Sequence, residues 1–193
     1  MKYLEAIGKY FIMIWEVFKK PTKWRIMKTL ILKEVDELVF GAMGIIIFIS
    51  FFIGGVVTIQ TALNLTNPLL PKSLIGFAAR QSVILEFAPT FTSIIMAGKV
   101  GSYITSSIGT MRVTEQIDAL ETLSLDPVAY LIFPRVVAGI VMFPVLIIIA
   151  DFFGIFGGAF ACVTSLDINL YQFLKGLKSW FNPWDATFGI IKA

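Results

Sequence analysis

The feature that most constrains this chain is a run of 26 residues without a charged side chain, from Leu38 to Leu63. A helix of that length extends about 39 Å at 1.5 Å per residue, which is enough to cross a hydrocarbon core of about 30 Å with some tilt. The run is too long and too far from the N-terminus to be a cleaved signal peptide. We therefore predict that residues 38–63 form a first transmembrane helix.

A second apolar stretch covers residues 81–105, and the glycines of Gly98–Gly101 mark its far end. The segment before it, residues 64–80, contains turn-forming pairs and predicts a short external loop. These pairs are Asn67-Pro68 and Leu70-Pro71. We therefore expect the second span to begin near residue 81.

A third apolar stretch covers residues 130–166. It exceeds one perpendicular crossing, so we expect one long helix that is kinked near Pro144. Two short spans joined by a turn within residues 151–158 are the alternative. Small residues in the first and third stretches predict close packing between helices. They are Gly54, Gly55, Gly154, Gly157 and Gly158.

The basic residues of the chain are concentrated near its N-terminus. Residues 1–37 hold eight Lys and Arg against five acidic residues, a pattern typical of a helix in the headgroup layer, with a plain cytoplasmic tail as the alternative. The loop that follows the first span contains two basic residues, Lys72 and Arg80, so the positive-inside rule places the N-terminus in the cytoplasm. Residues 167–193 contain two tryptophans and predict a periplasmic interfacial segment.

The segment between the second and third spans, residues 106–126, is amphipathic and acidic. Val113, Ile117 and Leu120 recur at helical spacing and predict one apolar face. Because this segment lies on the same side as the N-terminus, a rigid helix here would present a surface to a soluble partner. A helix that lies on the bilayer with its acidic face in water is the alternative.

Composition excludes most catalytic chemistry. The chain has no histidine and one cysteine, Cys162, so it lacks the converging ligands of zinc sites and the base of a Ser-His or Cys-His system. It also lacks the Gly-x-x-x-x-Gly-Lys-Ser/Thr phosphate loop of an ATPase. With 57% hydrophobic and 15% charged residues, we predict an all-α polytopic membrane protein that has no catalytic residue, metal, cofactor or nucleic-acid partner.

One long stretch resembles a known family. Residues 96–139 read MAGKVGSYITSSIGTMRVTEQIDALETLSLDPVAYLIFPRVVAG. The Gly-Lys-Val-Gly turn, the GTMRVTEQIDAL helix and the PRVVAG start of the next span follow in the order of the MlaE/YrbE-type permease signature. These permeases are the membrane subunits of ABC transporters that move phospholipids.

The resemblance implies a homodimeric permease of the bacterial inner membrane that moves lipids between inner and outer membrane. It implies a cytoplasmic ABC ATPase, a periplasmic MCE-domain lipid-binding protein and, in many systems, a small STAS-domain protein. Members usually continue for two more transmembrane helices, so we expect about three of five spans, with the last two family helices missing. The lipid species and the direction of transport are not indicated.

The resemblance also carries a coupling helix over to Gly109–Leu123. The residues expected to contact the ATPase are Arg112, Glu115, Gln116, Asp118 and Glu121. Local pairing of Arg112 with Asp118, worth a few tenths of a kcal/mol, is the alternative.

Glu86 is the second candidate site residue. A carboxylate at the centre of a span costs about 2.5–3.5 kcal/mol, so it usually faces a cavity or a partner. The resemblance places Glu86 and Pro89 near the lipid cavity, although the family glutamate precedes Gly-Pro directly, whereas Phe87 and Ala88 intervene here. Snorkelling of Glu86 to the outer interface is the alternative.

Two other functions fit the residues alone. A cation-coupled secondary transporter would use Glu86 and Asp151 as its intramembrane acids. A non-transporting membrane scaffold for a lipid-binding protein is the other.

Overall fold

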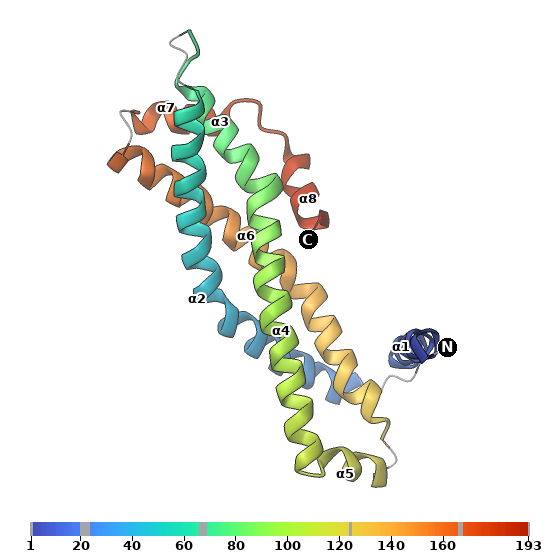
Figure 1. Ribbon diagram of the computed structural model, residues 1–193. Helices are drawn as coiled ribbons and strands as arrows, with labels where there is room; N and C mark the ends of the chain where they lie inside the picture. Colours follow the sequence, from blue (N-terminus) through green and yellow to red (C-terminus); the bar gives the residue numbers. More distant parts are fainter. Residues whose placement is uncertain (1, 20–23, 66–68, 124, 166–167, 193) are drawn as a thin grey trace. The chain divides into compact units, whose positions relative to one another are not determined.

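The computed structural model describes residues 2–19, 24–65, 69–123, 125–165 and 168–192, and every regular element in these ranges is a helix (Figure 1). In chain order the elements are α1 (Lys2–Lys19), α2 (Trp24–Asn64), α3 (Ser73–Ser82), the π-helix η1 (Val83–Phe87), α4 (Ala88–Val113), α5 (Gln116–Thr122), α6 (Pro127–Ser165), α7 (Leu170–Lys178) and α8 (Pro183–Lys192).

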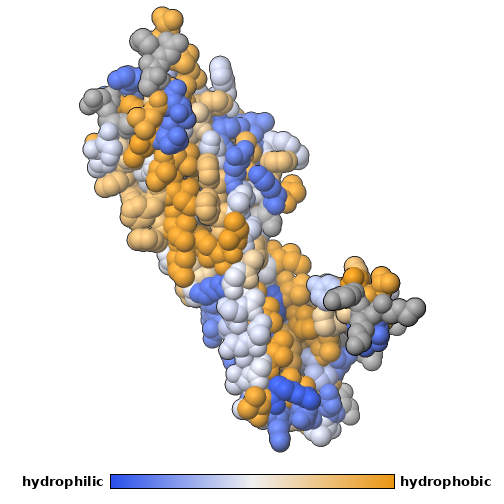
Figure 2. Space-filling model, in the orientation of Figure 1, coloured by the Kyte–Doolittle hydropathy of each residue, from blue (hydrophilic) through white to orange (hydrophobic). Residues whose placement is uncertain are grey.

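Three helical stretches are long and apolar enough to cross a membrane. They are Ile26–Asn64, Ser73–Val113 and Pro127–Ser165. The predicted fold class, an all-helical polytopic membrane protein with three spans, is therefore confirmed. Many large apolar side chains of these helices are exposed, among them Phe48, Phe152 and Phe156, and Figure 2 shows hydrophobic residues over wide areas of the surface. Such exposure fits helices that face lipid rather than water.

The helical stretch that contains the second span extends beyond residues 81–105 at both ends. The predicted loop 64–80 is wrong in its second half, because α3 begins at Ser73; the turn pair Asn67-Pro68 lies outside the described residues. The glycines of residues 98–101 do not end the helix, since α4 continues to Val113, and the predicted end of the membrane span near residue 105 stays a prediction. No proline follows Pro89 before Pro127, and glycines alone weaken a helix without ending it.

The third span is a single helix. α6 is helical from Pro127 to Ser165 and includes residues 151–158, so the alternative of two short spans is not observed. The C-terminal segment folds into α7 and α8, and its periplasmic interfacial position stays a prediction. The grouping of all segments into one membrane domain stays a prediction.

The chain divides into two compact units. Unit 1 comprises Met1–Gly41 and Lys99–Met142, and unit 2 comprises Ala42–Gly98 and Phe143–Ala193. Each of α2, α4 and α6 contributes one part to each unit.

Unit 2 is held by close helix packing. A Cβ added to Gly54 would lie 1.8 Å from the Gly154 carbonyl oxygen, and one added to Gly157 would lie 1.9 Å from the Phe51 oxygen. The α2 and α6 backbones are therefore in direct contact, as the small residues predicted. α3 and α7 pack in the same way, with Gly176 against the Ser73 carbonyl.

A buried arginine fixes the end of α7 in unit 2. Arg80 is only 3% exposed, and its guanidinium donates to the carbonyl oxygens of Leu177, Ser179 and Trp180 at 2.5, 3.1 and 3.4 Å. The last carbonyls of a helix have no partner within the helix, so Arg80 of α3 satisfies one of them, Leu177, together with two carbonyls that follow α7. Trp180, with φ 48°, is held in the left-handed region beside it.

Candidate functional site

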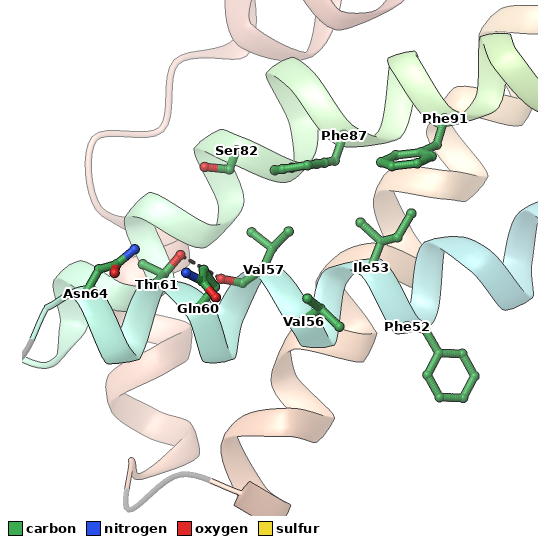
Figure 3. A pocket seen from close by; sticks show the side chains of 10 residues that line it. All are labelled: Phe52, Ile53, Val56, Val57, Gln60, Thr61, Asn64, Ser82, Phe87 and Phe91. Carbon is green, nitrogen blue, oxygen red and sulfur yellow. Dashed lines mark hydrogen bonds between the residues drawn. The ribbon is translucent and has the colours of Figure 1, made fainter.

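Unit 2 contains an apolar groove between α2 and the η1–α4 segment. Its volume is about 460 Å³, within the range of small-molecule sites. The lining residues are Phe52, Ile53, Val56, Val57, Gln60, Thr61, Asn64, Ser82, Phe87 and Phe91 (Figure 3).

The groove has a polar end and an aromatic end. Figure 3 shows Gln60, Thr61, Asn64 and Ser82 gathered at one end, with Phe91 toward the other. The rings of Phe87 and Phe91 are stacked with centroids 6.1 Å apart. Such a surface suits a molecule with an apolar body and a polar head.

The π-helix η1 shapes one wall of this groove. The Ala88 amide donates to the Val83 carbonyl, five residues back, and Pro89 has no amide hydrogen to donate to Leu85. The Leu85 carbonyl oxygen instead accepts from Lys192 Nζ of α8 at 3.1 Å. Gly189 of α8 packs against the Ile84 carbonyl, at 2.6 Å from where its Cβ would stand.

The predicted lipid-cavity residues lie beside the groove and do not line it. Pro89 is buried, and it acts through the helix geometry just described. Glu86 is exposed and is not among the residues that line the groove. The residues that line the groove include Phe87 and Phe91, which were not predicted from the sequence. An i, i+4 spacing relates these two phenylalanines, and the same spacing relates Gln60 and Asn64 on α2. This spacing could have indicated that each pair lies on one face of its helix.

Unit 1 carries the predicted ATPase-contacting segment, which forms two helices rather than one. α4 ends at Val113, Glu115 adopts the left-handed conformation with φ 56°, and α5 begins at Gln116. A single continuous helix over residues 106–126 or Gly109–Leu123 is therefore wrong, and the coupling role of this segment stays a prediction. The break between α4 and α5 could not be predicted from the sequence, because neither Gly nor Pro occurs at the turn.

The turn also divides the predicted apolar face between two helices, α4 and α5. Val113 lies at the end of α4 and is 84% exposed, whereas Ile117 and Leu120 lie on α5 and are half-buried. Thr114 does not cap α5, since its hydroxyl donates to the Thr110 carbonyl at 2.8 Å.

All five predicted coupling residues are exposed, one at the end of α4, one in the turn and three on α5. They are Arg112, Glu115, Gln116, Asp118 and Glu121. Arg112 Nη1 lies 3.0 Å from Asp118 Oδ1, so the local pair weighed from the sequence is formed. It joins α4 to α5 across the turn, and both partners remain open to a protein surface.

A comparison with known proteins decides the family. Residues 31–193 match the model of the permease MlaE. The chain belongs to the MlaE permease family. It is 32% identical to a probable ABC transporter permease of Rickettsia conorii, over all of this chain and 74% of the relative. It is 34% identical to a probable ABC transporter permease of Synechocystis, over 95% of this chain and 70% of the relative.

A third relative has a more specific name. The intermembrane phospholipid transport system permease protein MlaE of Haemophilus influenzae is 30% identical over 99% of this chain and 73% of that protein. The chain is thus an MlaE-family ABC transporter permease, a multi-pass membrane subunit that is not itself an ATPase. Such a permease implies an ATPase partner. Membership of this family does not support a cation-coupled secondary transporter.

Proposed function

We propose that this chain is the permease subunit through which phospholipids or related lipids pass between the inner and outer bacterial membranes. The similarity to the Haemophilus permease, whose name states intermembrane phospholipid transport, is the observation that carries the proposal. The groove of unit 2 supports it, because apolar walls suit acyl chains and the polar end suits a headgroup.

The driving force comes from a cytoplasmic ABC ATPase that binds the α4–α5 turn. The exposed acidic groups Glu115, Asp118 and Glu121 favour a basic surface on that partner, and Arg112 and Gln116 complete the contact. The N-terminus is cytoplasmic in this arrangement, and a homodimer spans the inner membrane. An MCE-domain protein on the periplasmic side and a STAS-domain protein on the ATPase complete the assembly that the family implies.

The lipid path includes the groove, with Glu86 and Pro89 at its edge. The exposed Glu86 carboxylate would face the second protomer or a passing headgroup, since an ionised group in contact with lipid tails is costly. Pro89 sets the π-helix that places Phe87 and Phe91 in the groove wall.

The proposal is tested by reconstituting the permease with its ATPase partner in vesicles of phosphatidylethanolamine and phosphatidylglycerol. ATP-dependent transfer of a fluorescent phospholipid to acceptor vesicles is measured. Gln60→Trp, which places an indole in the groove, is expected to reduce transfer at least tenfold. Leu63→Trp is the matched control, because Leu63 is exposed on the same helix outside the groove lining. No transfer by the parent protein, or equal transfer by both variants, would refute the proposal.

The ATPase contact is tested separately. Reversing Glu115 and Asp118 to Lys is expected to abolish co-purification of the ATPase in detergent. Unchanged recovery of the ATPase would overturn the docking assignment.

A further inference from the structure

Arg135 of α6 lies in a buried polar cluster in unit 1. Its side chain is 5% exposed, and its guanidinium is shared between two other helices. Nε donates to Glu34 Oε1 of α2 at 3.2 Å, and Nη2 donates to Ser107 Oγ of α4 at 2.6 Å. The Tyr103 ring of α4 lies over the same group, with its centroid 5.8 Å from Cζ. We call Glu34, Tyr103, Ser107 and Arg135 the Arg135 cluster.

The cluster is incompletely satisfied. Arg135 Nη1 and Glu34 Oε2 are buried and have no hydrogen-bond partner among the described residues. An arginine and a carboxylate commonly form two parallel hydrogen bonds, but here Nη2 donates one of its two N–H groups to Ser107 and none to the second carboxylate oxygen. Ser107 thus holds Nη2 in a position from which it makes no hydrogen bond to Glu34 Oε2.

The position of the cluster links it to the α4–α5 turn. Ser107 precedes Val113, the last residue of α4, by six residues, or about 9 Å of helix. Arg135 follows Pro127, the first residue of α6, by eight residues, or about 12 Å. The helices before and after α5 each carry one member of the cluster, and Glu34 is the member that α2 contributes.

We propose that Arg135 is a positioning residue that couples movement of the α4–α5 turn to α2 by exchanging partners. In the arrangement described, Nη2 binds Ser107, and α2, α4 and α6 are tied together. When the turn moves and Ser107 withdraws, Nη2 passes to Glu34 Oε2, which satisfies that oxygen and releases α4 from α6. A buried network with two discrete arrangements is the kind of element that transmits such a change. This inference rests on the proposed function, because the movement is supplied by the ATPase.

The test compares three serine variants in the reconstituted transporter. Ser107→Ala removes one of the two partners, so we expect ATP hydrolysis within twofold of the parent and lipid transferred per ATP about fivefold lower. Ser107→Thr keeps the hydroxyl and is expected to restore the ratio. Ser102→Ala is the matched control, since Ser102 is exposed on the same helix and donates only to the Lys99 carbonyl at 3.0 Å.

A second readout does not depend on lipid transfer. Spin labels on Lys33→Cys of α2 and Thr105→Cys of α4, both exposed in unit 1, report the distance between these helices in a Cys162→Ala background. ATP is expected to change this distance with Ser107 present and to leave it fixed in Ser107→Ala.

The outcomes separate this proposal from the function itself. An unchanged transfer ratio in Ser107→Ala, an equal loss in Ser102→Ala, or a loss of ATP hydrolysis in parallel with transfer overturns the coupling role. Absence of transfer by the parent overturns the proposed function, and the label distances then decide the partner exchange alone.

Discussion

The two units of this permease hold the same three helices by different physical means. In unit 2, glycines bring the α2 and α6 backbones into contact, with Gly54 against the Gly154 carbonyl. In unit 1, the parts of α2, α4 and α6 are joined through Arg135, and its ion pair leaves two buried polar atoms without partners in the described part of the chain. Backbone contact allows one tight arrangement, whereas the Arg135 guanidinium has, on our proposal, a second one in which it bonds Glu34 Oε2. The difference indicates that unit 2 is built for fixed packing and unit 1 for exchange.

The largest expected effect comes from leaving one charge of the Arg135 cluster without its partner. Arg135→Met should lower the free energy of unfolding by about 3 kcal/mol, because Glu34 would stay buried without its counter-ion. Adding Glu34→Met should bring the loss back to about 1 kcal/mol, since an apolar pair needs no hydrogen bonds.

Thermal unfolding of purified protein in detergent measures both variants. A double variant that is as unstable as the single one would show that the ion pair is needed for stability, and the contrast between the units would disappear.

The next effect tests the packing of unit 2. Gly157→Ala should lower the free energy of unfolding by about 2.5 kcal/mol, because a methyl group 1.9 Å from the Phe51 oxygen forces α2 and α6 apart. Gly44→Ala is the matched control, as nothing lies within 4 Å of its added Cβ and it belongs to the same unit. Equal melting temperatures for the two variants would contradict the close contact.

A smaller effect is expected from Arg80, which is the one buried cation among the described residues of unit 2. Arg80→Met should lower the free energy of unfolding by about 2 kcal/mol, since the Leu177 and Ser179 carbonyls at the end of α7 lose a charged donor. Amide hydrogen exchange should rise in α7 before it rises in α2. Lys175→Met is the matched control, because Lys175 is exposed on α7, and it should leave amide hydrogen exchange unchanged. A uniform rise of exchange over all helices in Arg80→Met would contradict a local role of Arg80.

The sequence predicts the fold because its signals are local. A charge-free run of 26 residues leaves a membrane span as the only outcome, and the small residues near Gly54 and Gly157 mark the helix contact without knowledge of the partner helix. The ordered motif of residues 96–139 points to the family, which the match over residues 31–193 confirms.

The site is less predictable, because its residues depend on contacts between distant segments. Arg80 looked like a loop charge, yet it binds carbonyls about a hundred residues away. The π-helix at Glu86 needs Pro89 and also α8, whose Lys192 satisfies the Leu85 carbonyl. Neither pairing has a period or spacing that a sequence pattern would reveal.

The smallest effect concerns the exposed pair at the α4–α5 turn. A double-mutant cycle on Arg112→Gln and Asp118→Asn should give a coupling energy of about 0.3 kcal/mol in the isolated permease, and this should shrink in high salt because both groups are exposed. A coupling above about 1 kcal/mol would make the pair structural, like the one at Arg135. A small value means that both charges can bind the ATPase without loss of stability. The pair then restrains the α4–α5 turn only weakly, and the buried Arg135 cluster in the same unit responds when the turn moves.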